Sequence, residues 1–285
     1  MSASFFPDTT KFSHANALRL GEAAALAYRT RKAIEEQTGL WGMQSKFIQD
    51  KTTDTQAFVA WDVEAVFVAF RGTETQKVQD IAVDAAAVFA KGPFAKSRIH
   101  AGFGTSLAAV WDRVVAAVTA AQAGGQSLWL TGHSLGGALA ALAAARFCSA
   151  KKPVWGLYTF GQPRVGDDAF ADTFNQRMRG RSFRYVNHSD IVPRVPPRVV
   201  GYADTDECMY FNASGDLKTG TAEWYRLLDT ITIDVKALGP MALSTVADHA
   251  MDRYLVNLRR AVRSGDAPQG SDLLDLLRRL AGGGN

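Results

Sequence analysis

SLWLTGHSLGGALAALAAARF, residues 127–147, is a short apolar stretch that passes through a glycine-rich turn into a run of alanines. The first part is typical of a buried strand and the last part of a helix. Between them lies Gly132-x-Ser134-x-Gly136, the pattern of a nucleophile elbow, in which a strained strand-to-helix turn exposes a serine hydroxyl. Chance gives about 0.1 such matches in a chain of this length. The strand and helix on either side favour the functional interpretation.

The rest of the chain alternates between strand-like and helical segments. This alternation predicts an α/β fold with a central, mostly parallel sheet flanked by helices. Helical spacing is strongest from Leu107 to Val118, where apolar residues recur at i, i+3, i+4, i+7, i+8 and i+11. A helix is also expected over 13–36, with Ser13 as its N-cap. Further strands are expected at 57–61, 65–70, 154–160 and 182–186, further helices at 168–178 and 250–262, and a late hairpin around 209–217.

The composition is that of an ordinary globular protein. The 285 residues include 32 Lys and Arg against 28 Asp and Glu, for a net charge of +4, and 47% are apolar. These values exclude global disorder. The longest apolar run, Ala138–Ala145, is far shorter than the roughly 18 residues of a membrane-spanning helix. The positive charge is scattered, so no nucleic-acid partner is expected. Cys148 and Cys208 match neither a disulfide scaffold nor a metal site and are expected to be free thiols.

The domain prediction is one α/β domain over residues 1–263, followed by a linker and short tail over 264–285. Residues 272–280 of that tail have the pattern of a short amphipathic helix. The first twelve residues lack the charged and apolar regions of a secretory signal. The chain as given is therefore expected to be cytoplasmic, unless a leader was removed or a non-classical export route is used.

A serine nucleophile of this kind needs a base and an acid, and in this fold class they follow it as acid and then histidine. His188 and His249 are the two of the five histidines that follow Ser134. His249 lies at a loop-to-helix boundary near the C-terminus, which makes it the candidate base. Asp190 follows the strand expected at 182–186, at the sheet edge where α/β sites form, and is the candidate acid. The fallback acids are Asp204, Asp206 and Glu207, while His133 is expected to point away from the serine.

Acyl transfer also needs two N–H donors for the oxyanion of the tetrahedral intermediate. Leu135 N–H, directly after the candidate nucleophile, supplies one. Thr73 is the candidate for the other, because it follows the strand expected at 65–70 and the flexible Gly72. From the residues alone, an ordinary turn residue is an equally good interpretation of Thr73. The segment 76–89 has amphipathic helical spacing and is expected to form a short helical lid, with a plain surface helix as the alternative.

With these residues assembled, the chain resembles the class 3, fungal-type triacylglycerol lipases of the α/β-hydrolase fold, over roughly Thr52 to Leu258. Besides the elbow, the motifs that carry the resemblance are Asp54-Thr55-Gln56-Ala57-Phe58-Val59, Phe70-Arg71-Gly72-Thr73, His100-Ala101-Gly102-Phe103, Thr159-Phe160-Gly161-Gln162-Pro163-Arg164-Val165-Gly166, Asn187 to Pro193, and Asp248-His249. The resemblance implies that Ser134 is the nucleophile, Asp190 the acid and His249 the base. It implies that Thr73 and Leu135 are the oxyanion donors.

One departure concerns the lid. Lids in the family often contain a tryptophan in an Asp-Trp-x-x-Asp stretch, and the matching segment here is Asp80-Ile81-Ala82-Val83-Asp84. A lid tryptophan that anchors at a lipid interface is therefore absent, which weakens the expectation of strong interfacial activation. The family's fungal members are secreted and disulfide-bonded, whereas this sequence shows neither feature.

The sequence therefore predicts a serine carboxylic-ester hydrolase, most simply a triacylglycerol lipase that forms an acyl-enzyme. The alternatives are a short-chain or feruloyl-type esterase, a phospholipase A1, and, in a different class, a non-catalytic lipid-binding module. No cofactor or metal is expected. The expected partners are an ester substrate such as an acylglycerol and, transiently, a lipid interface.

Overall fold

The computed structural model describes residues 5–72, 88–219 and 247–264. Strands alternate with helices along this chain, and the long apolar runs of the sequence form the strands at the centre of the sheet. The strands are β1 (Gln44–Asp50), β2 (Thr55–Trp61), β3 (Ala65–Phe70), β4 (Phe89–Lys91), β5 (Arg98–His100), β6 (Ser127–His133), β7 (Gly156–Phe160), β8 (Ser182–Asn187), β9 (Glu207–Phe211) and β10 (Leu217–Thr219). The helices are α1 (His14–Leu26), α2 (Arg31–Leu40), α4 (Ala101–Ala121), α5 (Leu135–Ser149), α6 (Asp168–Arg177) and α9 (Met251–Ser264), with short 3-10 turns at η1 (Val192–Arg194) and η2 (Arg198–Val200).

Eight strands form the main sheet, in the order β1-β2-β3-β6-β7-β8-β9-β10. The five strands from β3 to β9 pair in parallel, while β1, β2 and β10 add antiparallel edges. In the register of the central strands, Phe70 of β3 pairs with Gly132 of β6, and Gly132 pairs with Thr159 of β7. The carboxyl ends of these strands therefore lie side by side, which is where sites form in such sheets.

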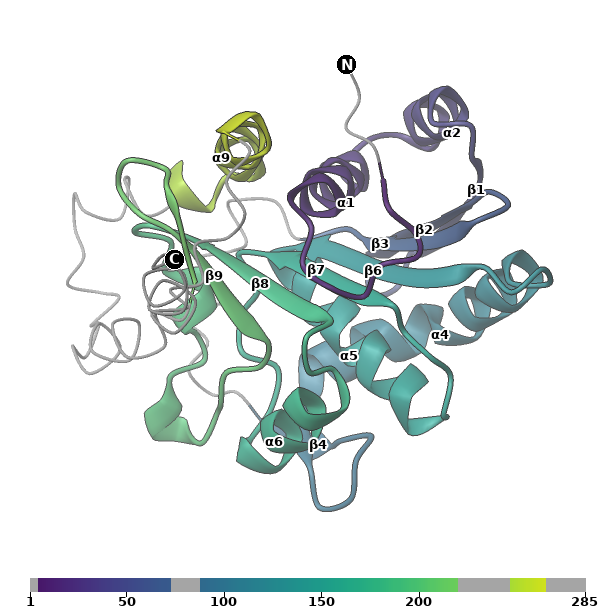
Figure 1. The fold of residues 1–285 in the computed structure, drawn as a ribbon. Coiled ribbons are helices and arrows are strands. Elements are labelled where there is room, and N and C mark those ends of the chain that lie inside the picture. Colours follow the sequence, from purple (N-terminus) through teal and green to yellow (C-terminus); the bar gives the residue numbers. More distant parts are fainter. Residues whose placement is uncertain (1–4, 73–87, 220–246, 265–285) are drawn as a thin grey trace, which may run out of the picture.

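Helices cover both faces of the main sheet (Figure 1). One face packs against α4, α5 and α6, and the apolar side of α4 meets buried residues of β1, β2 and β3. The opposite face packs against α1, α2 and α9. Because both faces are covered, the central strands are buried along their whole length, as expected for parallel strands.

Most of the expected elements are confirmed, including the two strands before the elbow, the helix around 107–118, both elements of the elbow and the hairpin formed by β9 and β10. The single helix expected over 13–36 is wrong, because the chain leaves α1 after Leu26 and Thr30 caps a second helix with its side chain. Ser13 does cap α1 as expected, accepting from Asn16 N–H.

The expected lid helix over 76–89 lies almost entirely outside the described residues. Its last two residues are described and neither is helical, since Val88 has no regular structure and Phe89 belongs to the short hairpin of β4 and β5. The expected tail helix at 272–280 also lies outside the described residues, and the division at residue 263 stays a prediction. Within the described ranges, no helix is long and apolar enough to cross a membrane. Cys148 and Cys208 are both free.

Candidate active site

Ser134 stands at the junction of β6 and α5, in a backbone conformation that ordinary residues rarely adopt, with φ of 57° and ψ of −130°. The two glycines of the motif make this turn sterically possible. A methyl group on Gly132 would lie 2.2 Å from the carbonyl oxygen of Gly136, and one on Gly136 would lie 2.2 Å from that of Phe70. Both distances are far inside van der Waals contact, so neither position can carry a side chain. The local sequence therefore produces the strained elbow directly.

The backbone of Ser134 is held while its hydroxyl is left without a partner. Ser134 N–H donates to the carbonyl of Phe160, at the end of β7, over 2.9 Å. The side chain is fully buried, and within the described part of the chain no group hydrogen-bonds to its Oγ. Leu135 is the first residue of α5, so its N–H has no acceptor within the helix. A buried, unpartnered hydroxyl thus lies beside a helix N-terminus.

His249 and Asp190 form a buried pair on the neighbouring loops. His249 Nδ1 lies 2.9 Å and 3.0 Å from the two carboxylate oxygens of Asp190, and both side chains are almost completely buried. Asp190 also accepts from the Tyr254 hydroxyl over 2.6 Å and from Val192 N–H over 2.9 Å. Asp190 therefore accepts from three donors. It fixes the His249 tautomer with the proton on Nδ1, which leaves Nε2 as the basic nitrogen.

The basic nitrogen is also free of partners. His249 Nε2 is buried and has no hydrogen-bond partner among residues 5–72, 88–219 and 247–264. Within these ranges, the unpartnered acceptor at the site is His249 Nε2 and the unpartnered donor is the Ser134 hydroxyl. In general-base catalysis by a serine and a histidine, the proton passes between these two atoms. Each would be costly to bury if it served no function.

Gly161, the residue after β7, lies between the elbow and the His249–Asp190 pair. It has a φ of 59°, and a methyl group there would lie 2.8 Å from His249 Cε1 and 2.9 Å from Asp190 Oδ2. The preceding residue, Phe160, accepts from Ser134 N–H. The end of β7 therefore contacts the nucleophile's backbone on one side and the candidate base and acid on the other. The sequence placed Gly161 in a motif without assigning it this role.

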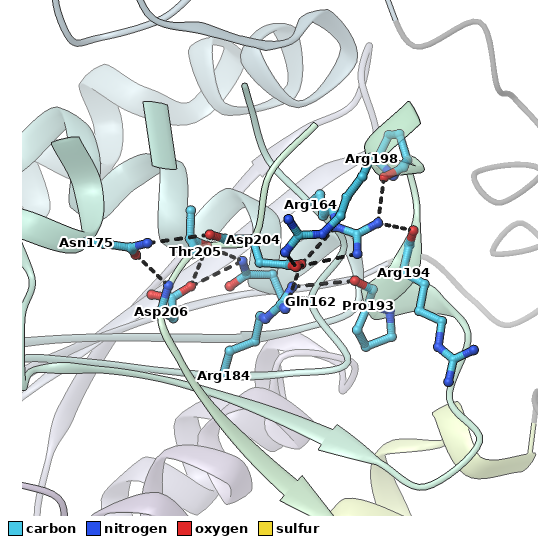
Figure 2. Close-up of polar contacts among 11 residues, drawn as sticks. Gln162, Arg164, Asn175, Arg184, Pro193, Arg194, Arg198, Asp204, Thr205 and Asp206 are labelled. Atoms are coloured by element: carbon cyan, nitrogen blue, oxygen red, sulfur yellow. Dashed lines mark hydrogen bonds and ion pairs between the residues drawn. The ribbon is translucent and has the colours of Figure 1, made fainter. Parts of the chain in front are cut away.

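Two of the fallback acids, Asp204 and Asp206, bind other side chains. Asp204 binds the guanidinium groups of Arg164, Arg184 and Arg198, and Asp206 accepts from Thr205 and Gln162 (Figure 2). Asp206 also accepts from the Ser182 hydroxyl. Burial alone would raise the pKa of Asp204, but Arg184 and Arg164 outweigh it and hold that pKa well below its usual range.

Glu207 and His188 do not contact the His249–Asp190 pair in the way an acid or a base would. Glu207, the third fallback acid, is exposed at the start of β9. The half-exposed His188 ring hydrogen-bonds to Ser189 Oγ and does not bond to Ser134. Asp190 is therefore the carboxylate that meets the candidate base.

Of the two expected oxyanion donors, Leu135 lies at the N-terminus of α5 as expected. Thr73 lies outside the described residues. The residue before it, Gly72, is tight against the elbow, since a methyl group there would lie 3.2 Å from Ser134 Cβ and 2.4 Å from the His133 carbonyl. The main chain after β3 therefore passes directly against Ser134 at Gly72, one residue before Thr73.

Two tyrosines of the site were missed by sequence reasoning. Tyr254 reaches Asp190 from α9, five residues after the candidate base. Tyr28, in the turn after α1, bonds to the ring of His133 over 2.8 Å. The sequence carries no signal for Tyr28, because its contact spans 105 residues. The position of Tyr254 one turn into the helix that follows His249 was the available signal for that residue. In the described ranges, no group of three or more His, Cys, Asp or Glu side chains could hold a metal ion.

Comparisons with known proteins agree with this architecture. The family model described as lipase (class 3) matches residues 67–200. A secreted mono- and diacylglycerol lipase 1 of Fusarium solani is 42% identical over 109 residues, covering 38% of this chain and 32% of that protein. A lipase of Rhizomucor miehei is 35% identical over 164 residues, covering 54% of this chain and 44% of that protein.

The similarity extends to three dimensions. A solved structure of the Rhizomucor miehei triacylglyceride lipase superposes with a TM-score of 0.61 at 27% identity, covering 76% of this chain and 91% of that chain. The sequence matches to the first curated relatives span between 32% and 58% of those proteins' own lengths. The chain is similar to the class 3, fungal-type lipases over residues 67–200 and has the α/β-hydrolase fold.

Proposed function

We propose that this protein is a serine carboxylic-ester hydrolase of the triacylglycerol lipase type. The observation that carries the proposal is the buried His249–Asp190 pair. Its Nδ1 is bonded to the carboxylate over 2.9 Å, and its Nε2 is unpartnered in the described part of the chain, as is the hydroxyl of Ser134 at the elbow. This is the set of groups that an acyl-enzyme mechanism requires.

In the proposed reaction, Ser134 Oγ attacks the ester carbonyl while His249 Nε2 takes its proton. Asp190 keeps the Nδ1–H tautomer and stabilises the imidazolium that forms. The N–H groups of Leu135 and Thr73 bind the oxyanion. His249 then protonates the departing alcohol, and the acyl group stays on Ser134. Water attacks the acyl-enzyme with the same base, which releases the acid and restores the serine.

The substrate class proposed is acylglycerols, because the relatives are named as lipases of mono-, di- and triacylglycerols. Contact with a lipid interface would then be transient. The competing ester substrates are short-chain or feruloyl esters and the acyl esters of phospholipids. A non-catalytic lipid-binding module is the alternative of a different class, and it is disfavoured by the intact His249–Asp190 pair.

The test is hydrolysis of p-nitrophenyl esters from acetate to palmitate, with emulsified triacylglycerol and phospholipid in parallel. Wild type and S134A are compared throughout. We expect turnover that rises toward medium or long acyl chains, extends to triacylglycerol, and falls by about 10³-fold or more in S134A. Activity confined to acetate and butyrate would move the function to an esterase. Turnover that survives in S134A would refute the mechanism.

The compartment is a separate question. The Fusarium and Penicillium relatives are named as secreted enzymes, which argues against the cytoplasmic expectation from the sequence.

A further inference from the structure

The side chain of His133, the residue before the proposed nucleophile, is buried between two groups far away in the sequence. Its Nε2 lies 2.6 Å from the backbone carbonyl oxygen of His249, and its Nδ1 lies 2.8 Å from the hydroxyl of Tyr28. The centre of its ring lies 4.5 Å from that of the His249 ring and 6.0 Å from that of the Tyr254 ring. It therefore points away from the reacting hydroxyl, as expected, but into the residue proposed as the base.

These contacts define the protonation of the His133 ring. Burial, together with the nearby His249, lowers the pKa of His133 to about 3, while the His249 carbonyl and Asp190 oppose the shift only partly. The ring is neutral at ordinary pH and carries one N–H. A carbonyl oxygen can only accept, so Nε2 must carry that proton. Nδ1 is then the acceptor, and the Tyr28 hydroxyl donates to it.

We propose that His133 is a positioning residue, which holds the backbone of His249 in register with Ser134 through the Nε2–H···O=C hydrogen bond. Tyr28 maintains the tautomer that makes this bond. The inference rests on the proposed function, because it concerns how the base meets the nucleophile. The relay runs from the turn after α1, through the last residue of β6, to His249, two residues before α9 begins.

The relay matters because the base and the nucleophile are on separate elements. Ser134 is fixed by β6 and α5, whereas His249 lies in the short segment between residue 246 and α9. His133 is covalently adjacent to Ser134 and hydrogen-bonded to His249 itself, so one side chain connects the two reacting residues. Small errors in the separation of reacting atoms reduce rate steeply. The neutral ring also adds no second positive charge beside the imidazolium that forms on His249 during acylation.

The proposal predicts different results for two substitutions of His133. In H133F an aromatic ring remains to pack against His249 and Tyr254, but the donor is lost. We expect kcat to fall by about 10- to 100-fold with KM changed by less than about 3-fold. In H133Q the side-chain amide can donate to the same carbonyl, and we expect it to restore kcat to within about 5-fold of wild type.

Tyr28 provides a second arm with a matched control. Y28F removes the hydroxyl that donates to His133, and we expect kcat to fall by about 2- to 5-fold. Tyr158 is a fully buried tyrosine in the core on the α1 face of the sheet, and its hydroxyl accepts from Ser13 N–H and has no part in the relay. Y158F should lower Tm without lowering kcat. Equal losses of kcat in Y28F and Y158F would indicate general destabilisation and overturn the proposal.

The decisive experiment combines kinetics with imidazole ¹⁵N NMR of the full chain. NMR should show His133 protonated on Nε2, unprotonated on Nδ1, and not titrating between pH 5 and 8. Full activity in H133F, failure of H133Q to recover, or a titrating His133 would overturn the positioning role. S134A, run in parallel, separates this from the proposed function. If wild-type turnover does not depend on Ser134, the proposed function fails and the relay has no reaction to serve, whatever the tautomer.

Discussion

Gly161 shows at the scale of single residues how little space surrounds the proposed base. Its left-handed backbone conformation and its contacts with His249 and Asp190 both exclude a side chain. The neighbouring constraints act in the same way, since the elbow glycines exclude a Cβ that would meet backbone. The geometry of the site therefore depends on these glycines, which leave room for their neighbours, as well as on the three proposed catalytic side chains.

G161A is expected to lower kcat by about 10²-fold, because the added methyl group displaces the His249 ring from Ser134. It should also lower stability by about 1–2 kcal/mol through the strained φ. G180A is the matched control. Gly180 also has a positive φ, of 71°, but a methyl group there would meet nothing within 4 Å. We expect G180A to lose similar stability with unchanged kcat, and equal kcat in both variants would contradict the steric account.

Y254F removes the hydroxyl that donates to Asp190 over 2.6 Å from a fully buried side chain. The Tyr254 oxygen also accepts from Asn187 N–H over 3.0 Å. Losing both bonds should destabilise the fold by about 1–3 kcal/mol. Because Asp190 is then held by fewer donors, kcat should fall by about 10-fold. Urea unfolding and initial rates on one ester measure both effects, and a kcat equal to wild type would show that Asp190 needs no support from α9.

The candidate site illustrates what sequence can predict at this scale. Ser134, Asp190 and His249 were predicted because their order and flanking elements follow the pattern of the fold class, and the structure brings His249 within 2.9 Å of Asp190. Tyr28, Tyr254 and the bond from His133 to His249 were not identified, because they depend on side-chain contacts between residues brought together only by folding. Their separations along the chain are 105, 64 and 116 residues.

At the scale of elements, the loop from Asp190 to β9 carries the candidate acid and is fastened by buried arginines. Arg164 donates to the carbonyls of Arg194 and Pro196, and Arg184 donates to that of Pro193 (Figure 2). Asp204 balances their charge at 2.8 Å from each guanidinium. The cluster ties η1 and the end of the loop to β7 and β8, and so stabilises the strand ends on which Asp190 stands.

D204A is expected to destabilise the protein by about 3–5 kcal/mol, because it leaves two buried guanidinium groups without their carboxylate. Asp216 offers a matched control, since it pairs with Arg260 at 3.2 Å on the surface, with both side chains about half exposed. D216A should change stability by less than about 1 kcal/mol. Urea unfolding of both variants gives the comparison, and similar values would refute the role of the buried cluster.

Asp206 should make stability depend on pH. Burial raises its pKa to about 6, although bonds from Thr205 and the charge of Arg184 act in the opposite direction. The folded state therefore binds this proton more tightly than the unfolded chain does. Its contribution to stability is fully present below about pH 4 and is lost as pH rises through about 6. The loss amounts to about 3 kcal/mol at most, and less because the side chain is partly exposed.

D206N removes this titration. The free energy of unfolding of wild type, minus that of D206N, should decrease between pH 4 and pH 7, as measured by urea unfolding at each pH. The difference is used because other carboxylates titrate in the same range and cancel in it. A difference that stays constant, or that increases with pH, would show that the pKa of Asp206 is not raised.

Helices and strands could be predicted from the sequence where one face, or the whole element, is buried and therefore apolar. β3, β6 and β7 are apolar along their length, and α4 has a continuous apolar stripe. β1 was missed because it is an edge strand with mostly polar residues, and such strands bury few side chains. The break between α1 and α2 was missed because both helices have apolar faces toward the same core, and the capping by Thr30 is a local hydrogen bond.

At the scale of the whole molecule, the two layers of helices on opposite faces of the sheet position different residues of the candidate site. α5, on one face of the sheet, begins directly after Ser134, while α9, on the other face, begins two residues after His249 (Figure 1). The site forms where these layers meet at the carboxyl ends of β3, β6, β7 and β8. The central claim is that Ser134, His249 and Asp190 act there as one catalytic unit.

The most direct test of that claim is labelling by a fluorophosphonate, followed by mass spectrometry, in wild type, H249A and D190N. The probe needs an activated serine and no knowledge of the substrate. The account predicts one adduct, on Ser134, with a labelling rate that falls by about 10²-fold or more in H249A and also falls in D190N. Labelling at another serine, or labelling of Ser134 at the wild-type rate in H249A, would contradict it.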